Sequence, residues 1–184
     1  MYEIWNRLQY LLSPQFDIYE NVARVVRGKV ADIGSGTGFG THILTRKAAH
    51  VDGYEIDETA LRFSQRVFDN SKIMFHYGDI TKGLEGDYDF VTMIDVIEHI
   101  EKDRTALKNC KALLKNKGAF IISTPNRLSR YRKASTHVRE YSPGELNTLL
   151  KRVFLHVDIR GYNLEASLSR YSNPIVAVCS VGDR

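Results

Sequence analysis

Residues Lys29 to Thr41 have the sequence Lys-Val-Ala-Asp-Ile-Gly-Ser-Gly-Thr-Gly-Phe-Gly-Thr, which is the most informative part of the chain for its fold. A short apolar run is followed by glycine at four alternate positions, and then by a helical pattern that starts at Ile43 and Leu44. The order predicts a buried strand, a tight turn and the beginning of a helix. Glycine lets the backbone approach a ligand closely, and α/β sheets bind small ligands where a strand leads into a helix. We therefore expect a ligand at this turn.

The spacing of the glycines argues against two common kinds of ligand. A dinucleotide-binding turn requires Gly-x-Gly-x-x-Gly, but Phe39 or Thr41 stands at the third place in the registers that start at Gly34 and Gly36. No Lys-Ser or Lys-Thr pair closes a phosphate-binding loop. A nicotinamide-dependent oxidoreductase is therefore disfavoured.

An acidic residue precedes the glycines, and the resulting stretch Asp-Ile-Gly-Ser-Gly-Thr-Gly resembles the first motif of the class I S-adenosylmethionine-dependent methyltransferases. In that family the turn lies against the amino-acid and ribose portions of the cofactor. The resemblance implies S-adenosyl-L-methionine as the cofactor. It also implies cofactor contacts from Asp32, Gly34, Ser35, Gly36 and Gly38.

Five later residues extend the predicted cofactor site. Glu55 ends the second predicted strand about twenty residues after the glycines, where an acidic side chain can accept both hydrogen bonds of a ribose diol. Ile56 would pack on the adenine face. Asp79 and Ile80 follow the third predicted strand and resemble the family's adenine-contacting turn. Ile94, at the end of the fourth strand, is the last cofactor contact that we predict.

Strand and helix patterns alternate along the rest of the chain. We expect strands at 30–33, 50–55, 73–77, 88–94, 119–123, 154–160 and 174–181. The expected helices run from the glycines to about Ala48, from Asp57 onward, over 106–114 with closure at Lys117-Gly118, and over 146–153 behind a Ser142 cap. This alternation predicts an α/β fold with a doubly wound, mostly parallel seven-stranded sheet, the Rossmann-like methyltransferase fold. The last two strands have no helix between them, so we expect them to form an antiparallel pair.

Length and composition predict one domain of 184 residues, with a helical cap at 1–28 and a cofactor-binding core at 29–184. The cap has helical patterns at 2–12, stopped by Pro14, and at 18–26. These helices would cover the cofactor, shape the substrate pocket, or simply cover one face of the sheet. No apolar stretch approaches the ~20 residues of a membrane span, no signal peptide is visible, and the two cysteines make no disulfide framework. We expect a cytoplasmic protein of undetermined oligomeric state.

The residues after the fourth strand narrow the reaction. Amino-group methylation of adenine or glutamine in this fold is marked by Asn/Asp-Pro-Pro-aromatic, but Ile94-Asp-Val-Ile stands here. Methylation at carbon 5 of cytosine needs a nucleophilic cysteine, whereas Cys110 and Cys179 fall in core patterns. Methyl transfer to an oxygen or to a small amine remains.

Three further stretches favour oxygen. Asp95-Val-Ile-Glu-His-Ile, Ile122-Ser-Thr-Pro-Asn-Arg and His137-Val-Arg-Glu-Tyr-Ser-Pro-Gly-Glu-Leu together resemble small stand-alone methyltransferases related to the ubiquinone-biosynthesis O-methyltransferases. Many such proteins are thought to act on glycans or secondary metabolites. The resemblance implies O-methylation of a small-molecule or glycan-type acceptor.

His99 is the predicted catalytic residue, because it follows the fourth strand at the crevice where the methyl group would lie. The alternative is a helix-start histidine bonded to the backbone. Related small-RNA 3′-end methyltransferases use Glu-x-x-Glu-His at this place to bind a metal ion, and Asp95, Glu98, His99 and His137 offer comparable ligands. Because the first acid here is the shorter aspartate, our prediction includes no metal ion, and this alternative stays open.

A basic loop follows the fifth predicted strand and borders the acceptor site of such a fold. It contains Arg127, Arg130, Tyr131, Arg132 and Lys133, and would either hold an anionic acceptor or RNA, or be solvated.

Two alternatives to a small-molecule methyltransferase remain. One is an RNA methyltransferase, and the other is a non-catalytic cofactor-binding module that regulates a partner.

Overall fold

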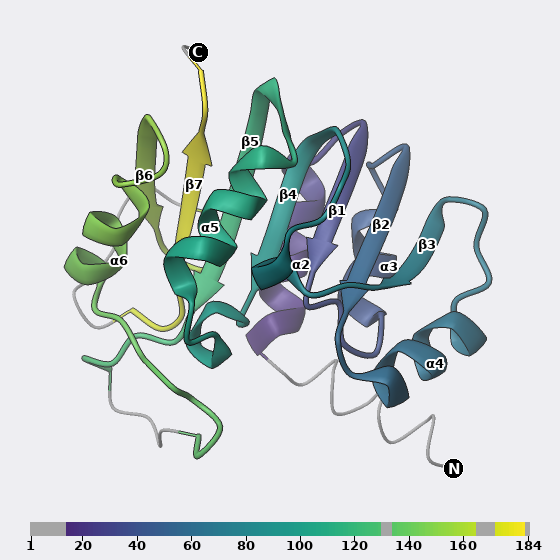
Figure 1. Cartoon of the computed structure of the whole chain (residues 1–184), viewed down its shortest axis with the longest axis horizontal. Coiled ribbons are helices and arrows are strands. Elements are labelled where there is room, and N and C mark those ends of the chain that lie inside the picture. Colours follow the sequence, from purple (N-terminus) through teal and green to yellow (C-terminus); the bar gives the residue numbers. More distant parts are fainter. Residues whose placement is uncertain (1–13, 130–133, 165–171, 183–184) are drawn as a thin grey trace.

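A computed structural model describes residues 14–129, 134–164 and 172–182, and its sheet runs across the molecule in Figure 1. The seven strands have the order β3-β2-β1-β4-β5-β7-β6. Their bounds are β1 (Lys29–Ile33), β2 (His50–Glu55), β3 (Ile73–Tyr77), β4 (Tyr88–Ile94), β5 (Leu114–Thr124), β6 (His156–Arg160) and β7 (Ile175–Ser180). The first five strands pair in parallel, and β7 is antiparallel to both β5 and β6. The predicted doubly wound sheet and its antiparallel C-terminal pair are confirmed.

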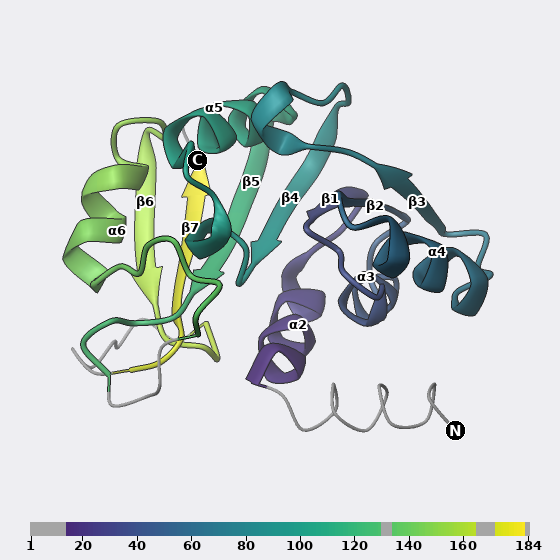
Figure 2. The same cartoon turned by 60° about the horizontal axis from the view of Figure 1, so that its bottom comes forward.

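Helices cover both faces of the sheet. The helices α5 (Asp103–Ala112) and α6 (Pro143–Leu150) lie on one face. Figure 2 shows α2 (Pro14–Val25), α3 (Phe39–Leu44) and α4 (Glu58–Val67) on the other. Two short 3₁₀ helices, η1 (Ile80–Lys82) and η2 (Ile97–His99), follow β3 and β4. None of the helices in the described ranges has both the length and the apolar character needed to cross a membrane.

The two faces of the sheet bury separate apolar clusters, because successive strand residues point to opposite sides. On β1, Val30 packs with the α2 and α3 residues, whereas Ala31 packs with the cluster that includes α5 and α6. On β5, Ile121 packs in the cluster that contains Val30, and Ile122 packs in the cluster that contains Ala31. Full burial of one large aliphatic side chain contributes roughly 1.5–3 kcal/mol, so both helical layers hold the sheet.

Local capping signals fix two of the helix starts as predicted. Asp57 accepts hydrogen bonds from the backbone of Thr59 and Ala60, both at 2.8 Å, and starts α4. Ser142 and Glu145 form a reciprocal capping box at the start of α6. Each such cap is worth typically ~1 kcal/mol to its helix.

The predicted boundary between the helix expected over 106–114 and the fifth strand is wrong. The helix ends at Ala112, not at Lys117-Gly118, and β5 begins at Leu114. Residue 114 pairs with Tyr88, and the register shifts before Phe90, so the polar segment 115–118 lies in an extended strand. The helix after the glycines is also shorter than expected, because it ends at Leu44 and is followed by turns.

The described part of the helical cap lies on the sheet. Helix α2 buries Ile18, Tyr19 and Val22 against the cluster that contains Val30. Among the roles expected for the cap, this helix therefore has that of covering one face of the sheet. The first predicted helix, at 2–12, lies outside the described residues.

Candidate active site

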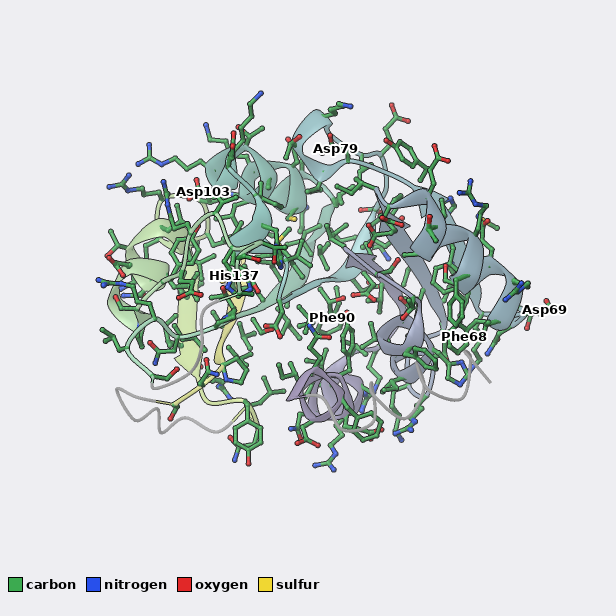
Figure 3. All side chains as sticks on the ribbon, turned by 90° about the horizontal axis from the view of Figure 1, so that it is seen from below. Phe68, Asp69, Asp79, Phe90, Asp103 and His137 are labelled. Carbon is green, nitrogen blue, oxygen red and sulfur yellow. The ribbon has the colours of Figure 1, made fainter. Side chains whose placement is uncertain are left out.

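A cleft of about 820 Å³ opens where β1, β2 and β4 end. Its lining includes six of the predicted site residues, namely Gly34, Glu55, Ile56, Asp79, Ile80 and His99. Figure 3 views the molecule from this side and labels Asp79, which lines the cleft, and His137, whose ring contacts that of His99. The strand ends thus bring together residues that are far apart in the sequence.

The glycine turn is held by the end of the neighbouring strand. The backbone nitrogens of Gly34 and Ser35 both donate to the Tyr54 carbonyl, at 2.8 and 3.0 Å. Gly34 has φ +72°, and a Cβ at this position would overlap the side chain of Val96. Only glycine therefore fits between β1 and the residues that follow β4.

Glu55 joins the turn to the end of β2. Its carboxylate accepts hydrogen bonds from the backbone of Gly36 at 2.8 Å, Ile56 at 2.7 Å and Asp57 at 2.8 Å. A carboxylate offers about four lone-pair positions, so three backbone donors leave capacity for one further donor. The side chain lies in the cleft lining and is fixed in place before any ligand binds.

The cleft lining also includes an exposed apolar side chain and a carboxylate. Ile56 is 60% exposed although it is a large apolar residue. Asp79 caps η1 by accepting from the backbone and hydroxyl of Thr81, and these hydrogen bonds hold its pKa below its usual value. Ile80 is buried, and its carbonyl accepts from the Asn109 amide at 2.6 Å.

Asp32 does not line the cleft. It is fully buried and accepts hydrogen bonds from the hydroxyls of Tyr19 at 3.0 Å, Thr41 at 2.7 Å and Thr92 at 2.7 Å. Burial raises the pKa of this carboxyl to about 6, although the three hydroxyls act in the opposite direction. Asp32 supports the turn from beneath.

Four other predicted cofactor residues also lie outside the cleft lining, namely Ser35, Gly36, Gly38 and Ile94. Ile94 is buried in the cluster on the α2 side of the sheet. Among the described residues, Ser35 Oγ is the one buried side-chain polar atom without a hydrogen-bond partner. An unsatisfied buried hydroxyl is rare and points to a missing partner.

His99 is exposed and also lines the cleft. Its Nδ1 lies 3.0 Å from the carbonyl oxygen of Thr136. Because a carbonyl only accepts, Nδ1 carries the hydrogen and Nε2 keeps its lone pair. The ring is thus bonded to the backbone, as in the alternative of a helix-start histidine. Its Nε2 still offers a proton acceptor to the cleft.

Acidic groups and a second histidine surround His99. One ligand atom of each of Glu98, His99 and His137 lies within 4.8 Å of the other two. Burial and then the charge of Asp95 raise the pKa of Glu98 to about 8, and burial raises the pKa of Asp95 as well. Asp95 has φ +53°, a strained conformation for a residue with a side chain and one that often occurs at functional sites.

Sequence reasoning missed two side chains that shape this site. Tyr19 lies within the helical pattern at 18–26, and nothing in the neighbouring sequence indicated its hydrogen bond to Asp32. Glu140 forms a 2.7 Å pair with His137, and only the spacing of three residues between an acid and a histidine could have suggested it.

The basic loop contributes less than expected within the described residues. The side chain of Arg127 binds Glu145 with two hydrogen bonds, at 2.7 and 2.9 Å. Residues 130–133, which contain the other predicted cations, lie outside the described residues.

A sequence profile of the methyltransferase domain family matches residues 31–122, which is half of the chain. The chain belongs to this family. The matched segment of this methyltransferase domain contains the glycine turn, Glu55, Asp79 and His99, and it includes all of the cleft lining except Thr136.

Known proteins are similar to this methyltransferase domain in sequence or in fold. The ubiquinone biosynthesis O-methyltransferase of Pseudomonas aeruginosa is 29% identical over 104 residues, which cover 54% of this chain and 45% of that protein. The chain spans about half the length of most of the curated relatives that it matches.

Two solved structures illustrate the shared fold. An S-adenosylmethionine-dependent methyltransferase from Clostridium acetobutylicum has a TM-score of 0.78 at 15% identity, with 99% of each chain covered. DhpI in complex with SAH has a TM-score of 0.73 at 17% identity, with 96% of this chain and 88% of DhpI covered. At such identities the likeness shows the fold alone.

Proposed function

We propose that this methyltransferase domain transfers the methyl group of S-adenosyl-L-methionine to a hydroxyl oxygen of a small-molecule or glycan-type acceptor. One observation carries the proposal. A single cleft at the strand ends is lined by Gly34 of the glycine turn, by an acid and an apolar side chain suited to a nucleoside, and by a histidine with a lone pair on Nε2. Membership of the methyltransferase family supports it, and the similarity to an O-methyltransferase favours an oxygen acceptor.

The cofactor would lie between Gly34 and Asp79. Glu55 would accept from one ribose hydroxyl at its remaining lone-pair position, Ile56 would cover the adenine face, and Asp79 would accept from the exocyclic amine. The exposed position of Ile56 supports this, because an adenine ring would remove its apolar surface from water. Ser35 Oγ, which has no partner, would donate to the cofactor directly or through water.

The acceptor would approach from the side of His99. When bound, S-adenosylmethionine would supply a methyl group on a sulfonium, and its transfer to the acceptor oxygen would leave S-adenosylhomocysteine. The hydroxyl proton would pass to Nε2 of His99, which keeps its lone pair because Nδ1 donates to Thr136. Alignment of donor and acceptor in the cleft supplies much of the acceleration.

The cluster of Glu98, His99 and His137 favours a second role for the same histidine. Two imidazoles and a carboxylate are a ligand set that suits Mn²⁺, Fe²⁺ or Zn²⁺, and their ligand atoms already converge. Burial and then the charge of Asp95 raise the pKa of Glu98, and a divalent cation would offset both effects by favouring the charged carboxylate. When bound, such an ion lowers the pKa of a hydroxyl that coordinates it. His99 would then act as a ligand and not as the base.

A transfer assay with S-adenosylmethionine labelled on the methyl group tests the proposal. Phenols, sugars and short RNAs serve as candidate acceptors. His99→Gln should lower transfer about 100-fold or more, whereas His156→Gln, an exposed residue on β6, should leave it unchanged. Loss of transfer with a chelator and its recovery with Mn²⁺ would assign His99 as a ligand, and indifference to the chelator would assign it as the base. Cofactor binding without transfer to any acceptor class would favour the regulatory alternative. Transfer to RNA alone would favour the RNA alternative.

A further inference from the structure

His137 and Glu140 form a part-buried pair beside the candidate active site. The Nδ1 atom of His137 lies 2.7 Å from Oε1 of Glu140, and both side chains are only 9% exposed. A carboxylate accepts hydrogen bonds and does not donate them, so Nδ1 of His137 carries the hydrogen. The lone pair of the neutral ring is therefore on Nε2.

The backbone of this segment is anchored to η2 without help from Glu140. The backbone nitrogens of Val138 and Arg139 donate to the Glu98 carbonyl, at 2.8 and 3.1 Å. Nδ1 of His99 donates to the Thr136 carbonyl at 3.0 Å. These three contacts place the backbone of residue 137 next to His99 whatever its side chain does.

The pair with Glu140 therefore controls the ring and not the chain path. The rings of His137 and His99 meet edge to face, with centroids 4.9 Å apart. Both histidines have Nδ1 bound to an acceptor, so each has its only lone pair on Nε2. A hydrogen bond to one ring nitrogen decides which nitrogen of a histidine can act as ligand or proton acceptor.

We infer that Glu140 is a positioning residue, which fixes the tautomer and orientation of His137 so that its Nε2 lone pair serves the cluster with Glu98 and His99. The inference rests on the proposed function only in assigning this cluster to the active site. An unprotonated Nε2 is required whether the cluster holds a cation or exchanges protons with an acceptor.

Nitrogen NMR of the histidine side chains tests the inference directly in the unliganded chain. At about pH 9, where imidazoles are uncharged, His137 should have its proton on Nδ1 in the wild type. Glu140→Ala should shift it to a mixture of tautomers. Glu140→Gln should restore the wild-type form, because the amide oxygen can accept the same bond. His99 is the internal control, since its partner is the Thr136 carbonyl and its tautomer should not change.

Titration with Mn²⁺ provides a readout of the cluster besides activity. Glu140→Ala should weaken binding about tenfold or more, and Glu140→Gln should stay near the wild type. If the tautomer of His137 responds to Glu140 while the wild type binds no Mn²⁺, the cation role fails and the positioning role stands. A wild-type His137 with its proton on Nε2, or a tautomer that Glu140→Ala leaves unchanged, overturns the inference.

Discussion

The hydroxyl of Tyr19 on α2 donates a hydrogen bond to Oδ1 of Asp32 on β1, at 3.0 Å, and both side chains are buried. Thr41 and Thr92 donate to the same carboxylate. Asp32 thus ties together a helix of the cap, the helix after the glycine turn, and two central strands. The acidic residue of the first motif acts here as an internal support for the turn.

Removal of the tyrosine hydroxyl should destabilise the fold. In Tyr19→Phe the buried carboxylate loses one of its three donors, which costs about 1–2 kcal/mol of the free energy of unfolding. Tyr162→Phe is the matched control, because Tyr162 is an exposed tyrosine. Chemical denaturation of both variants checks the prediction, and equal stabilities would contradict it.

Gly40 should be intolerant of alanine because of the same tyrosine. A Cβ on Gly40 would overlap the ring of Tyr19, whereas a Cβ on Gly144 would meet no atom within 4 Å. Both glycines lie in helices, where alanine is otherwise favoured by up to ~1 kcal/mol. Gly40→Ala should therefore lower the free energy of unfolding by about 1–3 kcal/mol, and Gly144→Ala should leave it equal or higher. A double variant with Tyr19→Ala should lose less than the sum of the single losses, and simple additivity would argue against the overlap.

The buried Asp32 should make stability depend on pH. Burial raises its pKa from 3.8 to about 6, so between these values the folded protein holds a proton that the unfolded chain has lost. The free energy of unfolding therefore falls as the pH rises through this window, by about 3 kcal/mol from this group. Other carboxyls have opposite shifts, so the measured quantity is the difference from Asp32→Asn. That difference should move in favour of the variant between about pH 4 and 6, and movement the other way would refute the assignment.

Local signals predicted much of the fold. The strands β3 and β4 have the predicted bounds, because each is a short run that ends at a residue unsuited to continue it, Gly78 or Asp95. The start of α6 was equally readable from its capping box. The start of β5 was not, because the polar residues 115–118 are extended through pairing with β4 and not through their own preference.

The residues of the candidate site also differ in whether their proximity could be predicted from the sequence. Glu55 is the last residue of β2, and Asp79 follows β3 after Gly78. Parallel strands end at one edge of the sheet, so the proximity of these two residues could be expected. Glu140 belongs to a segment that reaches η2 through contacts such as that between His99 and Thr136, which are 37 residues apart. Nothing in the sequence near either partner specifies that contact. The metal-ion alternative had already grouped His137 with His99, whereas the pair of Glu140 with His137 was established by the tertiary structure.

Replacement of Ser35 by alanine should have opposite effects on the stability of the fold and on cofactor binding. Its buried hydroxyl has no partner, so Ser35→Ala removes an unsatisfied polar atom and should raise the free energy of unfolding by about 1 kcal/mol. The same variant should bind S-adenosylhomocysteine several-fold more weakly if the hydroxyl meets the cofactor. Thermal unfolding with and without the ligand measures both effects. A variant that is less stable and binds normally would show that the hydroxyl has a structural partner.

Calorimetric titration with S-adenosylhomocysteine and with NAD tests the central claim, that the cleft at the strand ends is an S-adenosylmethionine site. Ile56→Ala is the informative variant and Leu155→Ala the control, because both side chains are 60% exposed and only the first lines the cleft. We predict that S-adenosylhomocysteine binds, that NAD does not, and that Ile56→Ala alone weakens binding by about 1.4 kcal/mol, or tenfold. Binding of NAD in place of S-adenosylhomocysteine, or equal affinities for the two variants, would contradict it.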